Sequence, residues 1–276
     1  MEIKNLAQTD LDSIVACFLN AFSEYFIQLP TETSYWAGRF QLARVDYSLS
    51  FGVFENEKLV AFIMNGIDRH DGKLTAFNTG TGVISEYRNR QLVDKMYAFA
   101  LPFFKERGIE KCVLEVVQKN DRAIRVYERI GFEKTRDYWG FRGEIKSESP
   151  GVEARGISFE ATKNFSNPNS YFYSWDNQDR AIELSREDCR FYEVFDEKAE
   201  KIGFFIFNPR LSFLAQFEIF DTNKPENWQK LFAGARQVGG TVKINNVDAR
   251  RQDLISAIIA AGLENHINQY EMEMSI

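Results

Sequence analysis

The sequence predicts an α/β protein made of two tandem domains of one fold, each a mixed central sheet flanked by helices. Segments with the two-residue period of strands alternate with segments of helical period. Helices fall between strands, as the crossover connections of a partly parallel sheet require. The second half of the chain also repeats the pattern of the first, and 276 residues are enough for two ordinary domains.

The first elements are a short strand at 3–5 and two helices. "TDLDSIVACFLNAFSEYF" carries apolar residues at helical spacing, with Thr9 as its expected N-cap. A second amphipathic stretch follows at 35–42. "FGVFENEKLVAFIMNGID" then predicts a hairpin with a polar turn at 55–58, and "GKLTAFNTGTGVI" predicts a further strand.

From Arg90 the apolar period becomes helical, and Gly108 fits the end of that helix. "KCVLEVV" predicts a buried strand. "NDRAIRVYERIGF" predicts a helix that ends at Gly131, and strands resume through Trp139 and Phe141.

The repeat is visible in two pairs of segments. "YEVFDEKAEKIGFFIF" (192–207) resembles "GVFENEKLVAFIM" (52–64). "VKINNVDARRQDLISAIIAAGLENHINQYEMEM" (242–274) resembles "CVLEVVQKNDRAIRVYERIGFEKTRDYWGF" (112–141). The polar segment 146–156 has the composition of a linker, so we expect domains at 1–145 and 157–276.

Composition argues against several function classes. The chain has 34 Lys and Arg against 40 Asp and Glu, a net charge of −6, whereas nucleic-acid binding needs a basic surface. Three widely separated cysteines and two histidines show no metal-ligand spacing, so no metal is expected and the cysteines are expected to be buried. No apolar run suits a signal peptide or a membrane span, which predicts a cytoplasmic protein without a membrane partner.

The stretch "GVISEYRNRQLVDKMY" (82–97) predicts a strand end, a polar loop and a helix start. Arg88 and Arg90 lie in the loop. Free N–H groups and the dipole at a helix N-terminus attract anions, so the loop is a candidate phosphate cradle.

This loop and the later block "NDRAIRVYERIGF" resemble the GCN5-related N-acetyltransferase (GNAT) family. In that family a strand ends in a loop of pattern Arg/Gln-x-x-Gly-x-Gly/Ala, whose amides hold the pyrophosphate of acetyl-CoA. The matching run is Arg88-Asn89-Arg90-Gln91-Leu92-Val93. Gln91 and Val93 stand where small residues are usual. We therefore expect a modified cradle in which Asn89 takes a left-handed conformation and the two arginines add charge.

The resemblance implies an acetyl-CoA-dependent N-acetyltransferase acting on a primary amine of a small molecule or peptide. The amine attacks the thioester directly, and the pantetheine arm lies along the strand that ends at Val83 and Ile84. Tyr127 is the implied acid for the departing thiolate. The implied cofactor-binding residues are Val83, Ile84, Arg88, Asn89, Arg90, Gln91, Leu92, Val93 and Asn120.

The general base stays open among Glu115, Glu24, Asp68 and His70. Aromatic residues that either pack the core or form an acceptor wall are Phe22, Tyr25, Phe26, Tyr35 and Trp36.

The second copy lacks the loop pattern, since "FEIFDTNKPENWQKLF" replaces it. Arg251 stands at the position of Asn120, and Ile258 at that of Tyr127. We expect a degenerate, non-catalytic domain there. Two alternatives are a CoA-responsive binding or regulatory module and a tandem aminoacyl transferase that uses charged tRNA. The net charge argues against the second.

Overall fold

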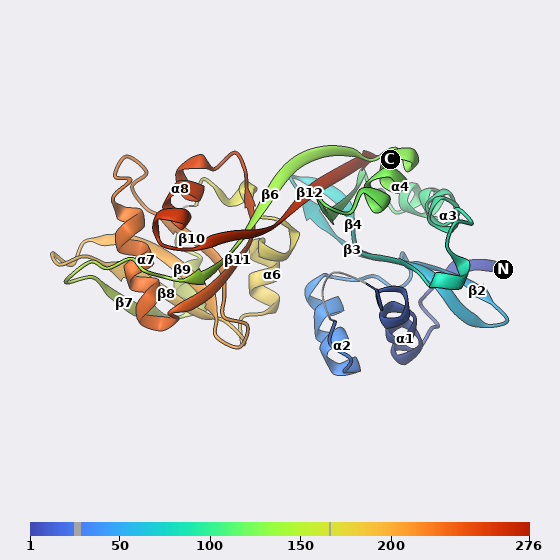
Figure 1. Cartoon of the computed structure of the whole chain (residues 1–276), viewed down its shortest axis with the longest axis horizontal. Coiled ribbons are helices and arrows are strands. Elements are labelled where there is room, and N and C mark those ends of the chain that lie inside the picture. The colour runs from blue at the N-terminus through green and yellow to red at the C-terminus, as the bar shows by residue number, and fades with distance from the viewer. Residues whose placement is uncertain (25–28, 166) are drawn as a thin grey trace. The chain divides into compact units, whose positions relative to one another are not determined.

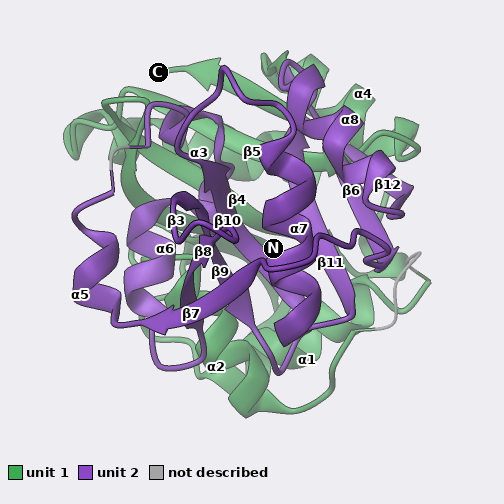
Figure 2. Cartoon of the chain, turned by 90° about the vertical axis from the view of Figure 1, so that its left-hand side faces the viewer, with its two compact units in different colours: residues 1–135, 271–276 green, residues 136–270 purple. Residues whose placement is uncertain are grey.

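The computed structural model describes residues 1–24, 29–165 and 167–276. Tyr25 and Phe26 lie outside the described residues. The chain divides into two compact units, one of residues 1–135 and 271–276 and the other of residues 136–270 (Figure 2). Each unit is a mixed sheet flanked by helices, which confirms the predicted fold class.

Unit 1 contains a sheet in the order β1-β2-β3-β4-β5-β12. Each of the strands β1 to β4 pairs antiparallel with the next one along the chain. Strands β4 and β5 are parallel and are joined by the crossover helix α3. Its elements are β1 (Glu2–Asn5), α1 (Leu11–Ala21), α2 (Thr33–Leu42), β2 (Phe51–Glu55), β3 (Lys58–His70), β4 (Lys73–Val83), η1 (Ser85–Tyr87), α3 (Leu92–Glu106), β5 (Lys111–Val117), α4 (Asp121–Ile130) and the end of β12.

The helices of unit 1 cover both faces of its sheet (Figure 1). On one face Phe18 of α1 stacks on Phe62 of β3, with ring centroids 4.9 Å apart. On the other face Phe51 of β2 meets Phe104 of α3 at 6.0 Å. The α1 helix begins one residue later than predicted, because Asp10 rather than Thr9 is its N-cap.

A bulge in β4 opens the sheet of unit 1. The register with β3 shifts between Met64 and Asn65, which leaves Thr79 as the extra residue of β4. The parallel pairing with β5 ends at the same place, at Asn78 and Leu114. Because a bulge bends its strand, the last residues of β4 diverge from β5 and expose a strand edge.

Unit 2 repeats this arrangement with the strand order β6-β11-β10-β9-β8-β7. Strands β9 and β10 are antiparallel, and β10 and β11 are parallel. Its elements are the main part of β6 (Glu133–Glu144), β7 (Glu153–Ile157), α5 (Phe159–Thr162), η2 (Ser170–Phe172), η3 (Trp175–Asn177), α6 (Asp179–Leu184), β8 (Arg190–Phe195), β9 (Lys201–Asn208), β10 (Phe213–Ile219), α7 (Asn227–Val238), β11 (Thr241–Asp248), α8 (Gln252–Ala260) and the first part of β12 (Glu264–Ser275).

The two copies exchange their last strands. The strand that follows α4 is β6, and it pairs with β11 inside unit 2, as Phe141 does with Ile244. The strand that follows α8 is β12, and its end lies in unit 1, where the Ile276 amide donates to the Glu110 carbonyl at 3.0 Å. The units therefore do not coincide with the predicted boundaries at 145 and 157, because the repeat continues through both exchanged strands.

The predicted linker is also shorter than expected. Residues Glu153–Ile157 form β7, an edge strand that pairs antiparallel with β8. Mostly exposed polar side chains are typical of a linker, but they also protect an edge strand from further pairing.

Candidate functional site

A cavity of about 770 Å³ lies in unit 1 between the end of β4, the loop before α3, and α4. It brings together most of the residues that the sequence singled out. Its lining includes Tyr127 and, of the predicted cofactor-binding residues, Val83, Arg88, Asn89, Arg90, Gln91, Leu92, Val93 and Asn120.

The N-terminus of α3 opens into this cavity without a side-chain cap. The backbone N–H groups of Leu92, Val93 and Asp94 have no acceptor within the helix, as in any first turn. Asn89 has φ of 63°, which confirms its predicted left-handed conformation. Gln91, the N-cap, is left-handed as well, with φ of 54°. That backbone conformation favours glycine, which explains why glycine is the usual residue there.

Arg88 supports the loop rather than offering a free charge to it. Its guanidinium donates to the carbonyls of Val83 at 3.3 Å and Ala21 at 3.1 Å. It also pairs with the Glu24 carboxylate at 2.8 Å. Glu24, far away in sequence, therefore offsets part of the Arg88 charge, and the role of Arg88 in the cradle stays a prediction.

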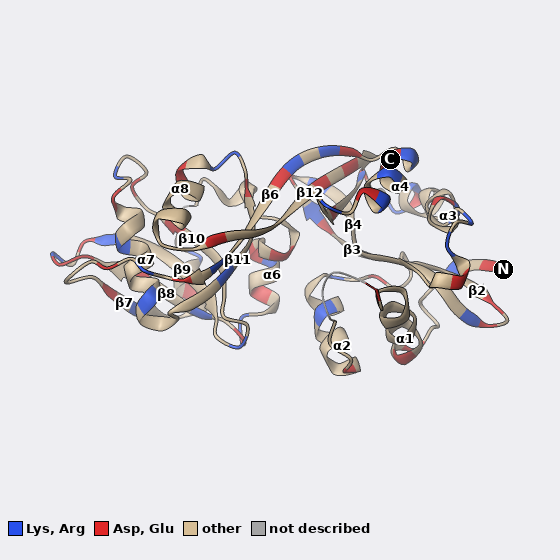
Figure 3. Cartoon of the chain, viewed as in Figure 1, with Lys and Arg blue, Asp and Glu red and all other residues tan. Residues whose placement is uncertain are grey.

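Three arginines of α4 line the opposite wall, and the sequence analysis missed them. Figure 3 colours the Lys and Arg positions of α4 blue. Arg122 donates to the Asn89 side-chain oxygen at 3.2 Å. Arg129 forms two bonds to Asp94, at 2.6 and 2.7 Å. Arg125 lies between them. Their spacing in "DRAIRVYER" places all three on one helix face, and that spacing was the available signal.

Asn120 and Tyr127 come from the two ends of α4. Asn120 is the N-cap of α4 and accepts the Ala123 amide at 3.2 Å. Tyr127 is half-buried, with its ring 5.7 Å from that of Phe132, and lines the cavity. The neighbouring Tyr97 is buried and bonded to Asn78 at 2.6 Å, and burial raises the pKa of its phenol.

Of the four candidate bases, the cavity lining includes Glu24 alone. Asp68 pairs with Arg44 at 3.2 Å. His70 is buried, with Nε2 3.3 Å from the Glu271 carboxylate. Glu115 is half-buried on β5.

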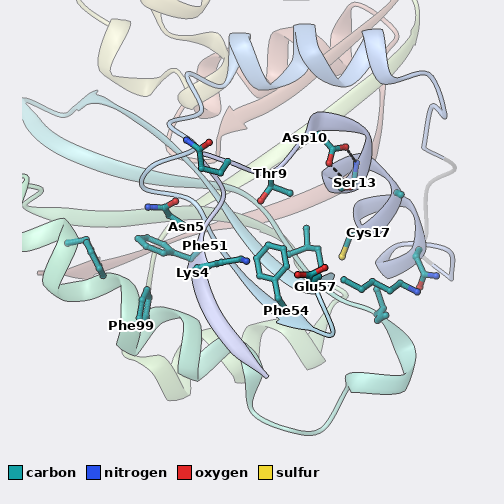
Figure 4. Close-up of a pocket in the computed structure, with 17 residues that line it drawn as sticks. Lys4, Asn5, Thr9, Asp10, Ser13, Cys17, Phe51, Phe54, Glu57 and Phe99 are labelled. Carbon is teal, nitrogen blue, oxygen red and sulfur yellow. Dashed lines mark hydrogen bonds between the residues drawn. The ribbon is translucent and has the colours of Figure 1, made fainter.

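Ile84, a predicted cofactor-binding residue, does not line this cavity. Its amide donates to the Val60 carbonyl at 3.0 Å, and its buried side chain lines a second cavity of about 880 Å³. The second cavity is formed by β1, α1, β2 and α3, and Figure 4 shows Asp10 bonded to Ser13 there. This cavity is larger, but Ile84 is the one predicted site residue that it contains. We therefore base the functional argument on the cavity beside α4.

Other predictions about reactive groups can be checked directly. Cys17, Cys112 and Cys189 are all buried, as predicted, and burial raises the pKa of the Cys17 thiol to about 12. Within the described ranges, no group of three or more His, Cys, Asp or Glu residues is placed to hold a metal ion. No helix in the described part of the chain is long and apolar enough to cross a bilayer.

The corresponding cleft of unit 2 is filled by its own chain. A bulge at Ala215 of β10 also ends the pairing with β11, at Phe213 and Lys243, but the cavity there measures about 30 Å³. The Tyr173 hydroxyl donates to the Phe217 carbonyl at 3.1 Å and accepts the Phe217 amide at 3.2 Å. It thus occupies the strand edge.

A buried ion pair completes the filling of this cleft. Arg251, the N-cap of α8, bonds to Glu218 at 2.8 Å, with 9% and 3% of the two side chains exposed. Burial alone would lower the pKa of Arg251, but its bonds to Asp253 and Glu218 raise it. The Asn177 side chain donates to the Asn245 carbonyl of β11 at 3.2 Å.

Comparisons with known proteins identify a matching family model, a curated relative and similar folds. Residues 15–132 match the model of the acetyltransferase (GNAT) family. A curated relative, N-alpha-acetyltransferase 30 of Schizosaccharomyces pombe, is 30% identical over 84 residues. That match covers 30% of this chain and 56% of the relative.

Solved structures show the same fold over the whole chain. A tandem GNAT protein from the clavulanic acid biosynthesis pathway has a TM-score of 0.69 at 12% identity, covering 99% of this chain and 98% of that one. An acetyltransferase structure from Pyrococcus horikoshii has a TM-score of 0.67 at 15% identity, covering 100% and 89%. Over its residues 15–132, the chain is therefore similar to the acetyltransferase (GNAT) family.

Proposed function

We propose that this protein is an N-acetyltransferase that takes its acetyl group from acetyl-CoA and transfers it to a primary amine of a small molecule or peptide. The observation that carries the proposal is the uncapped N-terminus of α3, which opens into a cavity of about 770 Å³ beside the diverging end of β4. Both features suit a ligand that combines phosphates with an amide-containing arm.

The residues of the cavity suit both the pyrophosphate and the pantetheine arm of acetyl-CoA. The amides of Leu92, Val93 and Asp94 and the guanidinium of Arg90 would hold the pyrophosphate. The edge of β4 up to Val83 would hydrogen-bond the amides of the pantetheine arm, in the manner of strand addition. In unit 2 the Tyr173 hydroxyl hydrogen-bonds to the equivalent strand edge. This supports the view that the backbone groups of such an edge need polar partners.

The chemistry needs no acylated residue, because a bound thioester supplies an acetyl group that an amine can attack directly. Tyr127 lines the cavity and would donate its phenolic proton to the departing thiolate. A base is still needed to deprotonate the amine. Glu24 is the candidate whose side chain lines the cavity and is largely exposed, although its bond to Arg88 competes for the carboxylate.

The acceptor class remains broad in this proposal. The curated relative's name specifies an alpha-amino group. A peptide amine is therefore a candidate acceptor, as is the amine of a small molecule. Unit 2 would then be non-catalytic, because its own residues fill the cleft that would otherwise take a donor.

Calorimetry with acetyl-CoA is the first test. Binding should raise the free energy of unfolding by about 2.7 kcal/mol at a hundredfold excess over the dissociation constant. No binding at millimolar ligand would overturn the proposal. Binding without acetyl transfer across a broad panel of amines would favour a CoA-responsive regulatory module instead.

Tyr127→Phe tests the chemical step. The ring remains, so fold and acetyl-CoA affinity should be kept, whereas turnover should fall by about 10²–10⁴-fold if the acid step limits the rate. Turnover should be compared at equal donor occupancy, with Tyr192→Phe in unit 2 as the control. Equal turnover in the wild type and Tyr127→Phe would leave the reaction without this acid.

A further inference from the structure

The edge strand β1 of unit 1 has backbone groups on one side that no described strand uses. Within the described residues, β1 pairs with β2 alone and stands at the end of the strand order. The Leu6 amide donates to the Ser50 carbonyl at 2.9 Å and continues the register of that pair. The backbone groups of every second residue in an antiparallel strand face the partner strand, so those of Ile3 and Asn5 point away from β2. They are therefore available to one further strand.

The side chains of β1 alternate between the two faces of the sheet. Asn5 lies opposite Phe51, whose ring packs on α3, so Ile3 and Asn5 are on the α3 face. Glu2 and Lys4 are therefore on the other face. The cavity of about 880 Å³ reaches both faces at this edge, because Lys4, Asn5 and residues of both α1 and α3 line it (Figure 4).

This cavity leaves room for a strand along the free edge of β1. On the α3 face its wall is apolar, because Phe99 and Phe103 are 36% and 40% exposed beside the buried ring of Phe51. On the other face its wall includes polar side chains of α1. A strand added along β1 would place alternate side chains against these two walls. The added strand should therefore alternate apolar and charged residues, as residues 2–4 of β1 do themselves.

The edge strand β7 is the counterpart of β1 in unit 2, and its charges are already paired. Arg155 bonds to Glu153 of the same strand at 2.7 Å, and its guanidinium lies over an aromatic ring of β8 at 4.2 Å. Lys4 lies over an aromatic ring of β2 in the same way, at 4.3 Å. Neither Lys4 nor Glu2, however, forms an ion pair with any described residue. The edge of unit 1 thus presents one acidic and one basic side chain that have no ion-pair partner in their own chain.

Two copies of β1 complement each other in one antiparallel register. When Ile3 lies opposite Ile3 of a second copy, their outward backbone groups bond to each other, and Glu2 of each copy lies opposite Lys4 of the other. Opposite charges in facing positions stabilise a strand pair, whereas like charges destabilise it. A shift by two residues in either direction would place Glu2 opposite Glu2 or Lys4 opposite Lys4. Charge therefore selects a register in which the backbone groups also match.

We propose that β1 is a self-association surface, to which a second copy of this chain adds its own β1 antiparallel and so extends the sheet of unit 1. A lysine on an edge strand commonly prevents such pairing, but here Glu2 of the second copy offsets the charge of Lys4. The surface goes beyond the proposed function, because no residue of β1 lines the cavity beside α4. Since β1 has only 4 residues, we expect a weak dimer with a dissociation constant in the micromolar range.

Sedimentation velocity on the full chain, over a range of micromolar concentrations, tests the proposal. The wild type should shift from monomer to dimer as its concentration rises. Ile3→Pro should remain a monomer, because it removes an N–H that points away from β2 and so blocks an added strand. The pairing of β1 with β2 should remain, which circular dichroism and thermal unfolding check. A wild type that stays monomeric throughout would overturn the proposal and leave this edge to a different chain.

Charge reversal tests the register. Glu2→Lys and Lys4→Glu each place like charges opposite each other, so each should raise the dissociation constant of the dimer about tenfold. The double change Glu2→Lys with Lys4→Glu exchanges the two charges and should restore the association of the wild type. A double variant that associates as weakly as the single variants would overturn the proposed pairing.

Glu153→Lys is the matched control, because it makes the same change of charge at the equivalent position of β7. It should leave association unchanged. If it weakens the dimer as much as Glu2→Lys does, net charge explains the effect and pairing through β1 is overturned. Dimers that persist at full strength in Ile3→Pro would place the interface elsewhere and would also overturn the proposal. Calorimetry with acetyl-CoA measures donor binding separately, so a failure of the proposed function would leave this result unaffected.

Discussion

The two units solve the same structural problem in opposite ways. In each, a bulge in the fourth strand of the repeat ends its parallel pairing and leaves a strand edge without a neighbour. Unit 1 keeps that edge open beside a cavity of about 770 Å³, whereas unit 2 closes it with Tyr173 and leaves about 30 Å³. Both copies of the fold therefore form a cleft at this strand edge. The side chains that enter the cleft decide whether it has room for a ligand.

The helices α4 and α8, which border the two clefts, also differ in whether their N-cap residue leaves the cleft open. Asn120 caps α4 through its short side chain and leaves the cavity open. Arg251 at the start of α8 instead extends to Glu218 of β10 and joins the two sides of the cleft. One substitution at a helix N-cap thus accompanies the conversion of a potential binding cleft into a packed interior.

Breaking the ion pair of unit 2 should have the largest effect. Arg251→Met leaves the buried Glu218 carboxylate without its cationic partner, and we expect the free energy of unfolding to fall by about 3–5 kcal/mol. Urea denaturation followed by circular dichroism measures this loss. Arg236→Met, which breaks an exposed pair with Glu148, should cost no more than about 1 kcal/mol. The double change Arg251→Met with Glu218→Leu should recover most of the loss, and no recovery would contradict this explanation.

Opening the filled cleft should have a smaller effect. Tyr173→Phe removes the hydroxyl that satisfies both backbone groups of Phe217, so we expect a loss of about 2 kcal/mol. Tyr192→Phe is the control, because the ring of Tyr192 stacks on Phe205 and its hydroxyl makes no described bond. It should change stability by less than about 0.5 kcal/mol. Equal losses in the two variants would show that the hydroxyl of Tyr173 does not hold the strand edge.

Relieving the strained loop of unit 1 should have the smallest effect. Gln91 is left-handed, so Gln91→Gly should stabilise the protein by about 1 kcal/mol. Thermal unfolding measures the gain. Gln91→Ala keeps a Cβ at the same position and should give no such gain. If glycine and alanine behave alike, the backbone of Gln91 is not the source of strain.

The sequence predicted what local patterns determine. The hairpin of β2 and β3 and the ends of α3 and α4 near Gly108 and Gly131 follow from short-range periodicity and composition. Most of the predicted site residues line the cavity beside α4, because two short motifs carry them, whereas the arginines of α4 were missed. Their assignment to a cofactor remains a prediction.

The sequence could not predict contacts made at long range. Arg88 pairs with Glu24 from 64 residues away, and Tyr173 reaches Phe217 across 44 residues. The exchange of β6 and β12 could not be predicted from the sequence for a related reason. Each strand follows its own helix as the repeat predicts, and the local pattern of a strand does not reveal which neighbour it pairs with.

The exchanged strand has a consequence for how the protein is made. Lys111 on β5 bonds to Glu273 at 2.8 Å, although the two are 162 residues apart. During translation the whole of unit 2 therefore leaves the ribosome before residues 271–276 can complete the sheet of unit 1. Until then β5 pairs with β4 alone, and its other edge, which β12 later covers, is open and can pair with other chains. A frameshift late in the message would thus damage the unit that was synthesised first.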